Sequence, residues 1–133
     1  MTRTIDAAIT FLPTRDLEEC AAFYEGLLGL PLVLDQGACR IYRVGRAAYF
    51  GFCKRAAPTR CEGAILTLVS GDVDGWAERI RRAGKMLEKE PAHNETYGIY
   101  HLFVRDPDGH LVEIQRFDDA SWSEGGSQPA AGQ

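Results

Sequence analysis

The chain carries one pattern twice, and this repeat constrains its fold more than any other feature. Residues 9–29 and residues 65–84 each contain an apolar run, a capping Asp and an amphipathic stretch that ends at Gly. Aligning Asp16 with Asp72, an offset of 56 residues, brings the apolar positions of the two copies into line. Such a pattern predicts a strand followed by an N-capped helix. A duplicated unit of this kind predicts a pseudo-symmetric fold.

Further strand-like segments follow each copy. They cover residues 32–34, 39–44 and 47–53 in the first copy and residues 86–88, 99–105 and 110–117 in the second. Residues 91–98 read as a loop, and the Asp106-Pro-Asp-Gly109 sequence is a strong turn signal. Each copy therefore reads β-α-β-β-β, with one sheet face left for a partner to bury. We expect an α+β fold of two pseudo-symmetric βαβββ modules, with curled mixed sheets enclosing a shared cleft.

The chain of 133 residues is long enough for one compact domain. We expect that domain to span residues 1–117, with module 1 at about 5–53, a linker at 54–61, module 2 at about 62–117, and a flexible C-terminal tail at 118–133. Ser, Gly, Ala and Gln dominate the tail, which is typical of disorder. Trp122 is the one anchor that the tail offers.

Charge and hydropathy narrow the location and the partners. A net charge of −4 argues against nucleic acid and is mildly compatible with a cationic ligand. No apolar run approaches the roughly 20 residues of a membrane span, and the polar start does not look like a signal peptide, so we expect a cytoplasmic protein without a membrane partner. The four cysteines show neither a C-x-x-C motif nor a zinc spacing, and we expect buried free thiols.

Three motifs together carry a family resemblance. They are R-D-L-x-x-x-x-x-F-Y-x-x-x-L-G-L at residues 15–30, G-D-V-D at 71–74 and D-P-D-G-H-L-V-E-I at 106–114. Over residues 5–117 the chain resembles the vicinal-oxygen-chelate superfamily, which includes glyoxalase I, extradiol dioxygenases, and the fosfomycin-resistance and bleomycin-resistance proteins. The resemblance implies paired βαβββ modules. It also implies a divalent metal held by His, Gln or Glu from the first and last strand of each module, acting as a Lewis acid.

The family's metal-ligand positions are mostly apolar in this chain. The first-strand positions fall on Ile9 and Ile65, and the last strand of module 1 contains no carboxylate. Only Glu113, in the last strand of module 2, has a ligating side chain. Because a divalent metal needs several N or O ligands, we expect no metal and no other cofactor.

Glu113 is the candidate catalytic residue. Strand alternation places it with Leu111 and Gln115 on the cleft side, where it would act as a general base or as a polar anchor for a ligand. The alternative is a structural carboxylate satisfied by its neighbours. A two-residue turn would put His101 on the opposite sheet face, which we favour, whereas a loop one residue longer would put His101 on the face of Glu113.

Candidate ligand-binding residues come from both modules. Arg40 and Tyr42 share one face of their strand and would offer a cation and a phenol to an anionic or carbonyl ligand. The alternatives are a surface role for Arg40 and core packing for many of the aromatic rings. The full candidate set is Arg40, Tyr42, Phe50, Phe52, Tyr100 and Gln115.

Two functions remain open. The first is metal-independent binding of a small molecule in the cleft, as the resemblance to the bleomycin-resistance branch implies. The second is a small-metabolite isomerase, lyase or dioxygenase that uses Glu113 as a base or as one ligand of a nonstandard metal site. By the same resemblance we expect a homodimer.

Overall fold

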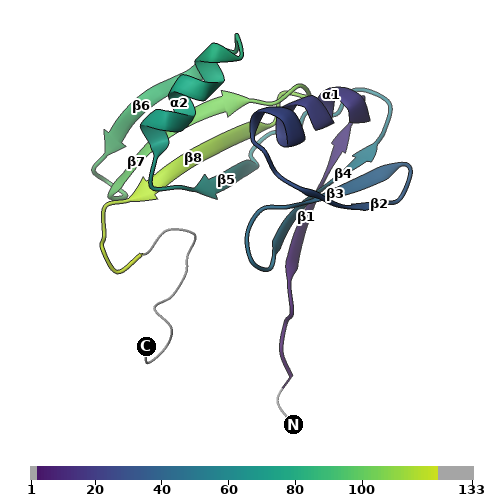
Figure 1. Cartoon of the computed structure of the whole chain (residues 1–133), viewed down its shortest axis with the longest axis horizontal. Coiled ribbons are helices and arrows are strands. Elements are labelled where there is room, and N and C mark those ends of the chain that lie inside the picture. Colours follow the sequence, from purple (N-terminus) through teal and green to yellow (C-terminus); the bar gives the residue numbers. More distant parts are fainter. Residues whose placement is uncertain (1–2, 123–133) are drawn as a thin grey trace. The chain divides into compact units, whose positions relative to one another are not determined.

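The computed structural model describes residues 3–122, and its first module is a four-stranded mixed sheet with a helical layer on one face (Figure 1). In chain order its elements are β1 (Ala8–Thr14), helix α1 (Leu17–Ala21), which continues as the π-helical segment η1 (Ala22–Leu27), β2 (Leu32–Asp35), β3 (Cys39–Arg43) and β4 (Ala48–Lys54). The strand order is β1-β4-β3-β2. Strands β1 and β4 run parallel, and the other neighbours run antiparallel.

The second module repeats this topology (Figure 1). Its elements are β5 (Ile65–Val69), α2 (Val73–Arg82), β6 (Leu87–Asn94), β7 (Ile99–Arg105) and β8 (Leu111–Phe117), with strand order β5-β8-β7-β6. Strands β5 and β8 are the parallel pair. The predicted α+β fold of two βαβββ modules is confirmed. The shared cleft stays a prediction.

Two predicted boundaries differ from the structure. The first strand of module 1, β1, begins at Ala8, whereas we expected the module to begin at about residue 5, and β6 continues through Pro91 to Asn94, where we expected a loop. Two register irregularities in the pairing of β6 with β7 accommodate this continuation. Pro91 is tolerated there because β6 is an edge strand with a neighbour on one side only. Proline has no backbone N–H, and at the edge of a sheet this donor is not needed for pairing on the open side.

An aspartate caps the helix of each module, as the repeat predicts. The Asp16 carboxylate accepts hydrogen bonds from the backbone N–H groups of Glu18 and Glu19 at 2.9 and 3.1 Å. The Asp72 carboxylate accepts one from the N–H of Gly75 at 3.0 Å. Since the N–H groups of the first turn have no partner within the helix, these carboxylates fix where each helix begins.

Aromatic side chains fill the core of the first module. Tyr24, from η1, lies against Phe52 with ring centroids 4.4 Å apart and is close to Tyr42 and Phe50. All four rings are buried. The core of the second module is aliphatic instead, with α2 packed on the sheet through Val73, Ala77, Ile80, Leu102, Val112 and Ile114.

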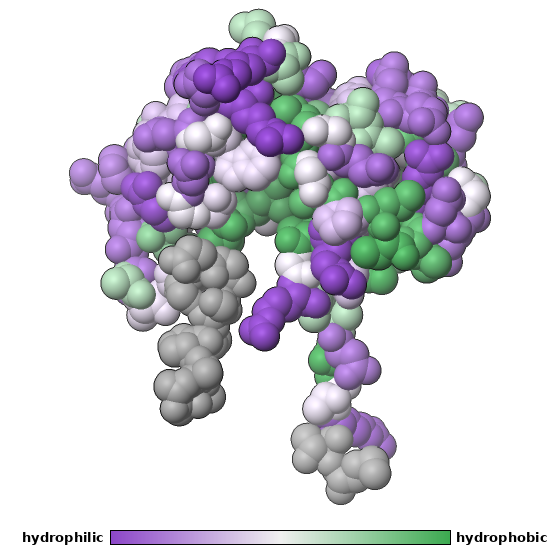
Figure 2. All heavy atoms as spheres, viewed as in Figure 1, coloured by the Kyte–Doolittle hydropathy of each residue, from purple (hydrophilic) through white to green (hydrophobic). Residues whose placement is uncertain are grey.

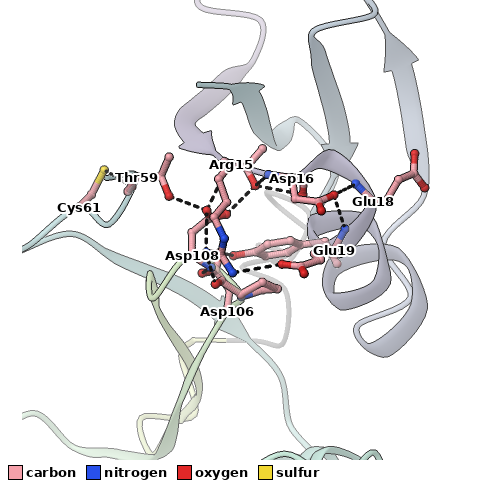
Figure 3. A network of polar contacts seen from close by, with 11 residues as sticks. Arg15, Asp16, Glu18, Glu19, Thr59, Cys61, Asp106 and Asp108 are labelled. Carbon is pink, nitrogen blue, oxygen red and sulfur yellow. Dashed lines mark hydrogen bonds and ion pairs between the residues drawn. The ribbon is translucent and has the colours of Figure 1, made fainter. Parts of the chain in front are cut away.

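The turn between β7 and β8 belongs to the compact unit formed by the first module (Figure 3). The Asp108 carboxylate accepts hydrogen bonds from the hydroxyls of Thr14 and Thr59, both at 2.5 Å, and from the backbone N–H of Arg15 at 2.9 Å. The Tyr24 hydroxyl donates to Asp106 at 2.7 Å. The Asp-Pro-Asp-Gly motif is therefore both a turn and the acceptor centre of a buried polar network.

Two of the four cysteines form a disulfide, so the expectation of four free thiols is wrong for this pair. Cys39 on β3 lies directly opposite Cys53 on β4, with Cα atoms 4.1 Å apart and a bond between the sulfurs. The strand register creates this juxtaposition, which the spacing of the cysteines along the chain does not indicate. Cys20 and Cys61 keep their thiols.

The chain leaves β8 through a short turn in which the Trp122 ring stacks on Phe117, with centroids 4.3 Å apart. The expected flexible tail covers residues 118–133, and its part beyond residue 122 lies outside the described residues. No helix within residues 3–122 is long and apolar enough to cross a membrane.

Candidate functional site

The candidate site lies on the face of the second sheet opposite α2. Because side chains alternate along a strand, Glu113 and Gln115 of β8 share this face, as predicted, while Val112 and Ile114 pack toward the helix. The register places Thr67 of β5 beside Glu113. This face therefore presents a carboxylate, an amide and a hydroxyl within one patch of the sheet.

The longer of the two loops that we considered joins β7 and β8. Phe103 pairs with Glu113 and His101 pairs with Gln115, so the two-residue turn and the opposite face that we favoured for His101 are wrong. The left-handed backbone of Gly109, at φ +86°, and a hydrogen bond from its N–H to the Asp106 carbonyl close the loop. The extra residue turns His101 onto the face of Glu113.

His101 and Glu113 form a buried pair. Nδ1 of His101 lies 2.6 Å from Oε2 of Glu113, and the Thr67 hydroxyl donates to Oε1 of Glu113 at 2.8 Å. Only 5% of the His101 side chain and 10% of the Glu113 side chain are exposed. Nε2 of His101 is buried and has no hydrogen-bond partner among residues 3–122. A buried nitrogen without a hydrogen-bond partner lowers the stability of the fold, and such atoms often belong to functional sites.

The contact between His101 and Glu113 links the form of the imidazole to that of the carboxylate. An ionised carboxylate only accepts hydrogen bonds, so with Glu113 ionised Nδ1 of His101 is the donor, and in a neutral ring Nε2 is then an acceptor. A carboxylate that orients an imidazole in this way is a common arrangement for proton transfer. The pair can therefore hold a hydrogen-bond donor or move a proton.

A pocket of about 720 Å³ opens over this face. That volume lies within the range of pockets that bind drug-sized molecules. Most of its wall is apolar or aromatic, and Glu113, His101 and Gln115 supply polar groups. The remaining lining residues are Ile65, Lys89, Asn94, Tyr97, Ile99, Phe103 and Phe117. All ten belong to the second module.

The aromatic candidates of the first module are misplaced in our prediction. Tyr42, Phe50 and Phe52 are at most 8% exposed and pack against Tyr24 in the core, instead of facing a cleft. Alternation indicates which residues share a face, but it does not indicate which face the helix covers. Burial raises the pKa of Tyr42 to about 12, as expected for a core phenol.

Arg40 and Tyr100 also lie away from the pocket. The Arg40 guanidinium pairs with Glu18 at 2.9 Å and with Asp35 at 3.7 Å, next to helix α1. Tyr100 is on the helix side of the second sheet, where its hydroxyl donates to Asp74 at 2.6 Å. This hydrogen bond raises the pKa of the Tyr100 phenol. Of the predicted set, the structure brings together only Glu113 and Gln115.

Sequence reasoning missed Thr67, named Phe103 only as one of several aromatic residues near the cleft, and favoured the wrong face for His101. Thr67 was recognisable as a lone hydroxyl in an otherwise apolar strand, at the position that parallel pairing sets beside Glu113. The sheet face on which Phe103 and His101 lie depends on the length of the turn between β7 and β8.

The donor set at Glu113 does not fit the family's divalent metal. The equivalent first-strand position is Ile65, which has no donor atom, and Glu113 and His101 are hydrogen-bonded to each other, which leaves Gln115 as the one further His, Gln or Glu side chain that lines the pocket. Among the His, Cys, Asp and Glu side chains of residues 3–122, the group of three that could hold a metal ion is Asp106, Asp108 and His110, and it does not include Glu113.

Comparisons with known proteins agree with this fold. The family model for the Glyoxalase/Bleomycin resistance protein/Dioxygenase superfamily matches residues 5–114, so the chain belongs to that superfamily. No curated protein matches significantly.

Many solved structures share the fold. A virulence protein from Salmonella typhimurium is 23% identical with a TM-score of 0.68, and the match covers 88% of this chain and 98% of that chain. A lactoylglutathione lyase from Agrobacterium tumefaciens is also 23% identical with a TM-score of 0.68, covering 81% and 90%. A glyoxalase/bleomycin resistance protein/dioxygenase from Nocardioides is 19% identical with a TM-score of 0.67, covering 98% and 90%.

Proposed function

We propose that the protein binds a small molecule, without a metal or another cofactor, in the pocket over β7 and β8. One observation carries the proposal: a drug-sized pocket with largely apolar walls has a buried, hydrogen-bonded Glu113–His101 pair among its lining groups. Pockets of this composition bind apolar ligands and use a few polar groups to orient them.

A ligand screen on the purified protein tests this proposal. A ligand that binds the native state raises the melting temperature, and NMR chemical-shift changes at Gln115 and Phe103 would place it in the pocket. We expect Phe103→Ala to weaken binding of a confirmed hit and Tyr49→Phe, on β4 of the first module and outside the pocket lining, to leave it unchanged. Ligands that change chemical shifts only in the first module would contradict the proposed binding pocket.

Metal content is a separate test. We expect the protein purified without added metal to contain less than stoichiometric zinc, nickel, manganese and iron. The reason is that Glu113 and His101 are hydrogen-bonded to each other and too few further ligands surround them. Stoichiometric metal that is lost in Glu113→Gln would overturn the metal-free proposal. It would instead indicate a nonstandard metal site.

The second candidate function is an isomerase, lyase or dioxygenase of a small metabolite with Glu113 as the base. The His101–Glu113 distance of 2.6 Å and the unpartnered Nε2 favour it, because a paired imidazole and carboxylate can take up and return a proton. The lactoylglutathione lyase among the similar structures adds only a shared fold. Turnover of a confirmed ligand, abolished by Glu113→Gln with binding retained, would establish this candidate, whereas binding without turnover would exclude it for that ligand.

We also propose a cytoplasmic homodimer that binds no nucleic acid. The edge strand β2 supports a self-association surface, because Leu32, Val33 and Leu34 are 37, 40 and 48% exposed, and Figure 2 shows apolar surface on the side of the first module where β2 lies. An exposed apolar edge strand is prone to pair with another chain. Sedimentation velocity is expected to give a dimer for the native chain and a monomer for Leu34→Lys. A monomeric native chain would contradict this proposal.

A further inference from the structure

We propose that the ligand of the β7–β8 pocket is an arylalkyl amine in its protonated form, with the ammonium group held at Glu113 and the ring lying against the aromatic walls. This inference rests on the proposed binding function and adds the chemical class of the ligand. It differs from the anionic or carbonyl ligand that Arg40 suggested from the sequence alone.

Two charged residues line the pocket, Glu113 and Lys89, and the buried one, Glu113, is an acceptor. Oε1 and Oε2 of Glu113 each receive one hydrogen bond, from Thr67 and His101, and each oxygen has a second lone pair. Nε2 of His101 is a further acceptor when Nδ1 carries the proton, although protein atoms cover it in this state. A ligand that donates hydrogen bonds can use these lone pairs, whereas a carboxylate on the ligand would be repelled by Glu113.

No fixed cation neutralises Glu113. Within residues 3–122 its only ion-pair partner is His101, which is charged only when protonated. Lys89 lines the pocket, but its ammonium is not within ion-pair distance of the carboxylate, and Arg40 is paired with Glu18 in the other module. A carboxylate that is 90% buried is stabilised strongly by a cation at close range. A protonated amine on the ligand provides that cation.

The pocket walls suit the rest of such a ligand. Phe103 and Phe117 line the pocket and offer ring surfaces to an aromatic group, and an aromatic face also attracts a nearby ammonium. Ile65 and Ile99 add aliphatic surface. The net charge of −4 attracts a cation at long range, although it does not direct the cation to this pocket.

Three probes with one ring and different head groups test the inference: benzylamine, benzyl alcohol and benzoate. Binding is measured by NMR titration near neutral pH, with the shifts of Gln115, His101 and Phe103 reporting on the pocket. We expect benzylamine to bind at least about tenfold more tightly than benzyl alcohol, because a charged hydrogen bond replaces a neutral one, and benzoate to bind most weakly. This comparison uses the native chain, so it does not depend on the folding of a variant.

A pair of variants then assigns the preference to Glu113. Glu113→Gln keeps the shape of the side chain and is expected to remove the roughly tenfold preference for benzylamine. Glu62→Gln, at an exposed residue paired with Arg60, changes the net charge equally and is expected to leave the preference intact. If Glu113→Gln does not fold, the decision rests on the three probes with the native chain.

The outcomes separate the two proposals. Equal or tighter binding of benzyl alcohol or benzoate in the pocket would overturn the amine class and leave the binding function in place. So would library ligands that bind there while benzylamine does not. A pocket that takes no small molecule at all would overturn both proposals.

Discussion

At the scale of single residues, the His101–Glu113 pair should make a measurable contribution to stability. Removing either partner leaves the other buried with one hydrogen bond fewer, so we expect His101→Leu and Glu113→Leu each to cost about 1–3 kcal/mol of the free energy of unfolding. The double variant should cost less than the sum of the two, because contacting residues couple by about 0.5–3 kcal/mol. Urea unfolding of the four proteins in this cycle measures the coupling.

An exposed pair provides the matched comparison for this cycle. Arg105 on β7 and Glu88 on the neighbouring strand β6 lie 2.8 Å apart, but their side chains are 31 and 46% exposed. Their coupling is expected to be below about 1 kcal/mol, since water screens exposed ion pairs. Equal coupling in the two cycles would contradict the special role of the buried pair.

Tyr24 should make the protein sensitive to alkaline pH. Burial and the neighbouring Asp106 carboxylate raise the pKa of its phenol well above the ordinary 10.0. Above pH 10 the unfolded chain loses this proton while the folded chain keeps it, so the free energy of unfolding falls as pH rises. The expected slope is up to about 1.4 kcal/mol per pH unit from this group. Below pH 10 its contribution does not change.

The variant Tyr24→Phe tests the predicted fall in the free energy of unfolding above pH 10. The variant should be less stable near neutral pH by about 1–2 kcal/mol, because Asp106 loses the hydrogen bond at 2.7 Å, yet its stability should fall less steeply above pH 10. Urea unfolding as a function of pH measures both effects. Tyr97→Phe, at a side chain that is 73% exposed, should change neither. Parallel profiles for the native chain and Tyr24→Phe would show that Tyr24 does not titrate differently in the two states.

At the scale of elements, the disulfide between Cys39 on β3 and Cys53 on β4 predicts how many free thiols the protein has. Thiol titration of the unreduced, denatured protein should find two thiols from Cys20 and Cys61, and four after reduction. The bond closes a loop with a sequence separation of 14, so reduction should lower the free energy of unfolding by about 2–3 kcal/mol. Cys39→Ser should have a similar effect and should be insensitive to reductant. Four thiols without reduction would show that the bond does not form.

Individual elements also show what could be predicted from the sequence. The repeat and its capping aspartates predicted two βαβββ modules, and alternation predicted that Glu113 and Gln115 share a face. These features depend on local patterns of period two and on helix caps. The Cys39–Cys53 bond and the position of His101 depend on register, which one residue in a turn can shift. The burial of Tyr42 depended on which sheet face the helix covers, and local periodicity does not contain that information.

At the scale of the whole molecule, the two modules should not fold as separable halves. Residues 106–109 lie in the sequence of the second module but in the compact unit of the first. A fragment ending at Glu62 would lack Asp108, the acceptor for the buried hydroxyls of Thr14 and Thr59, and would also lack the Asp106 partner of Tyr24. Each buried donor left without a partner costs about 1–3 kcal/mol, so the summed loss approaches the whole stability of a small domain.

We therefore expect the fragment of residues 1–62 to lack a cooperative unfolding transition by circular dichroism, whereas the full chain shows one. In the full chain, Asp108→Ala should lower stability more than Asp16→Ala, since Asp108 accepts three hydrogen bonds from outside its own turn and Asp16 only caps the exposed start of α1. Cooperative unfolding of the fragment would refute this interdependence, because the turn would then be dispensable for the first module. The repeat that organises the sequence would in that case also mark two independent folding units.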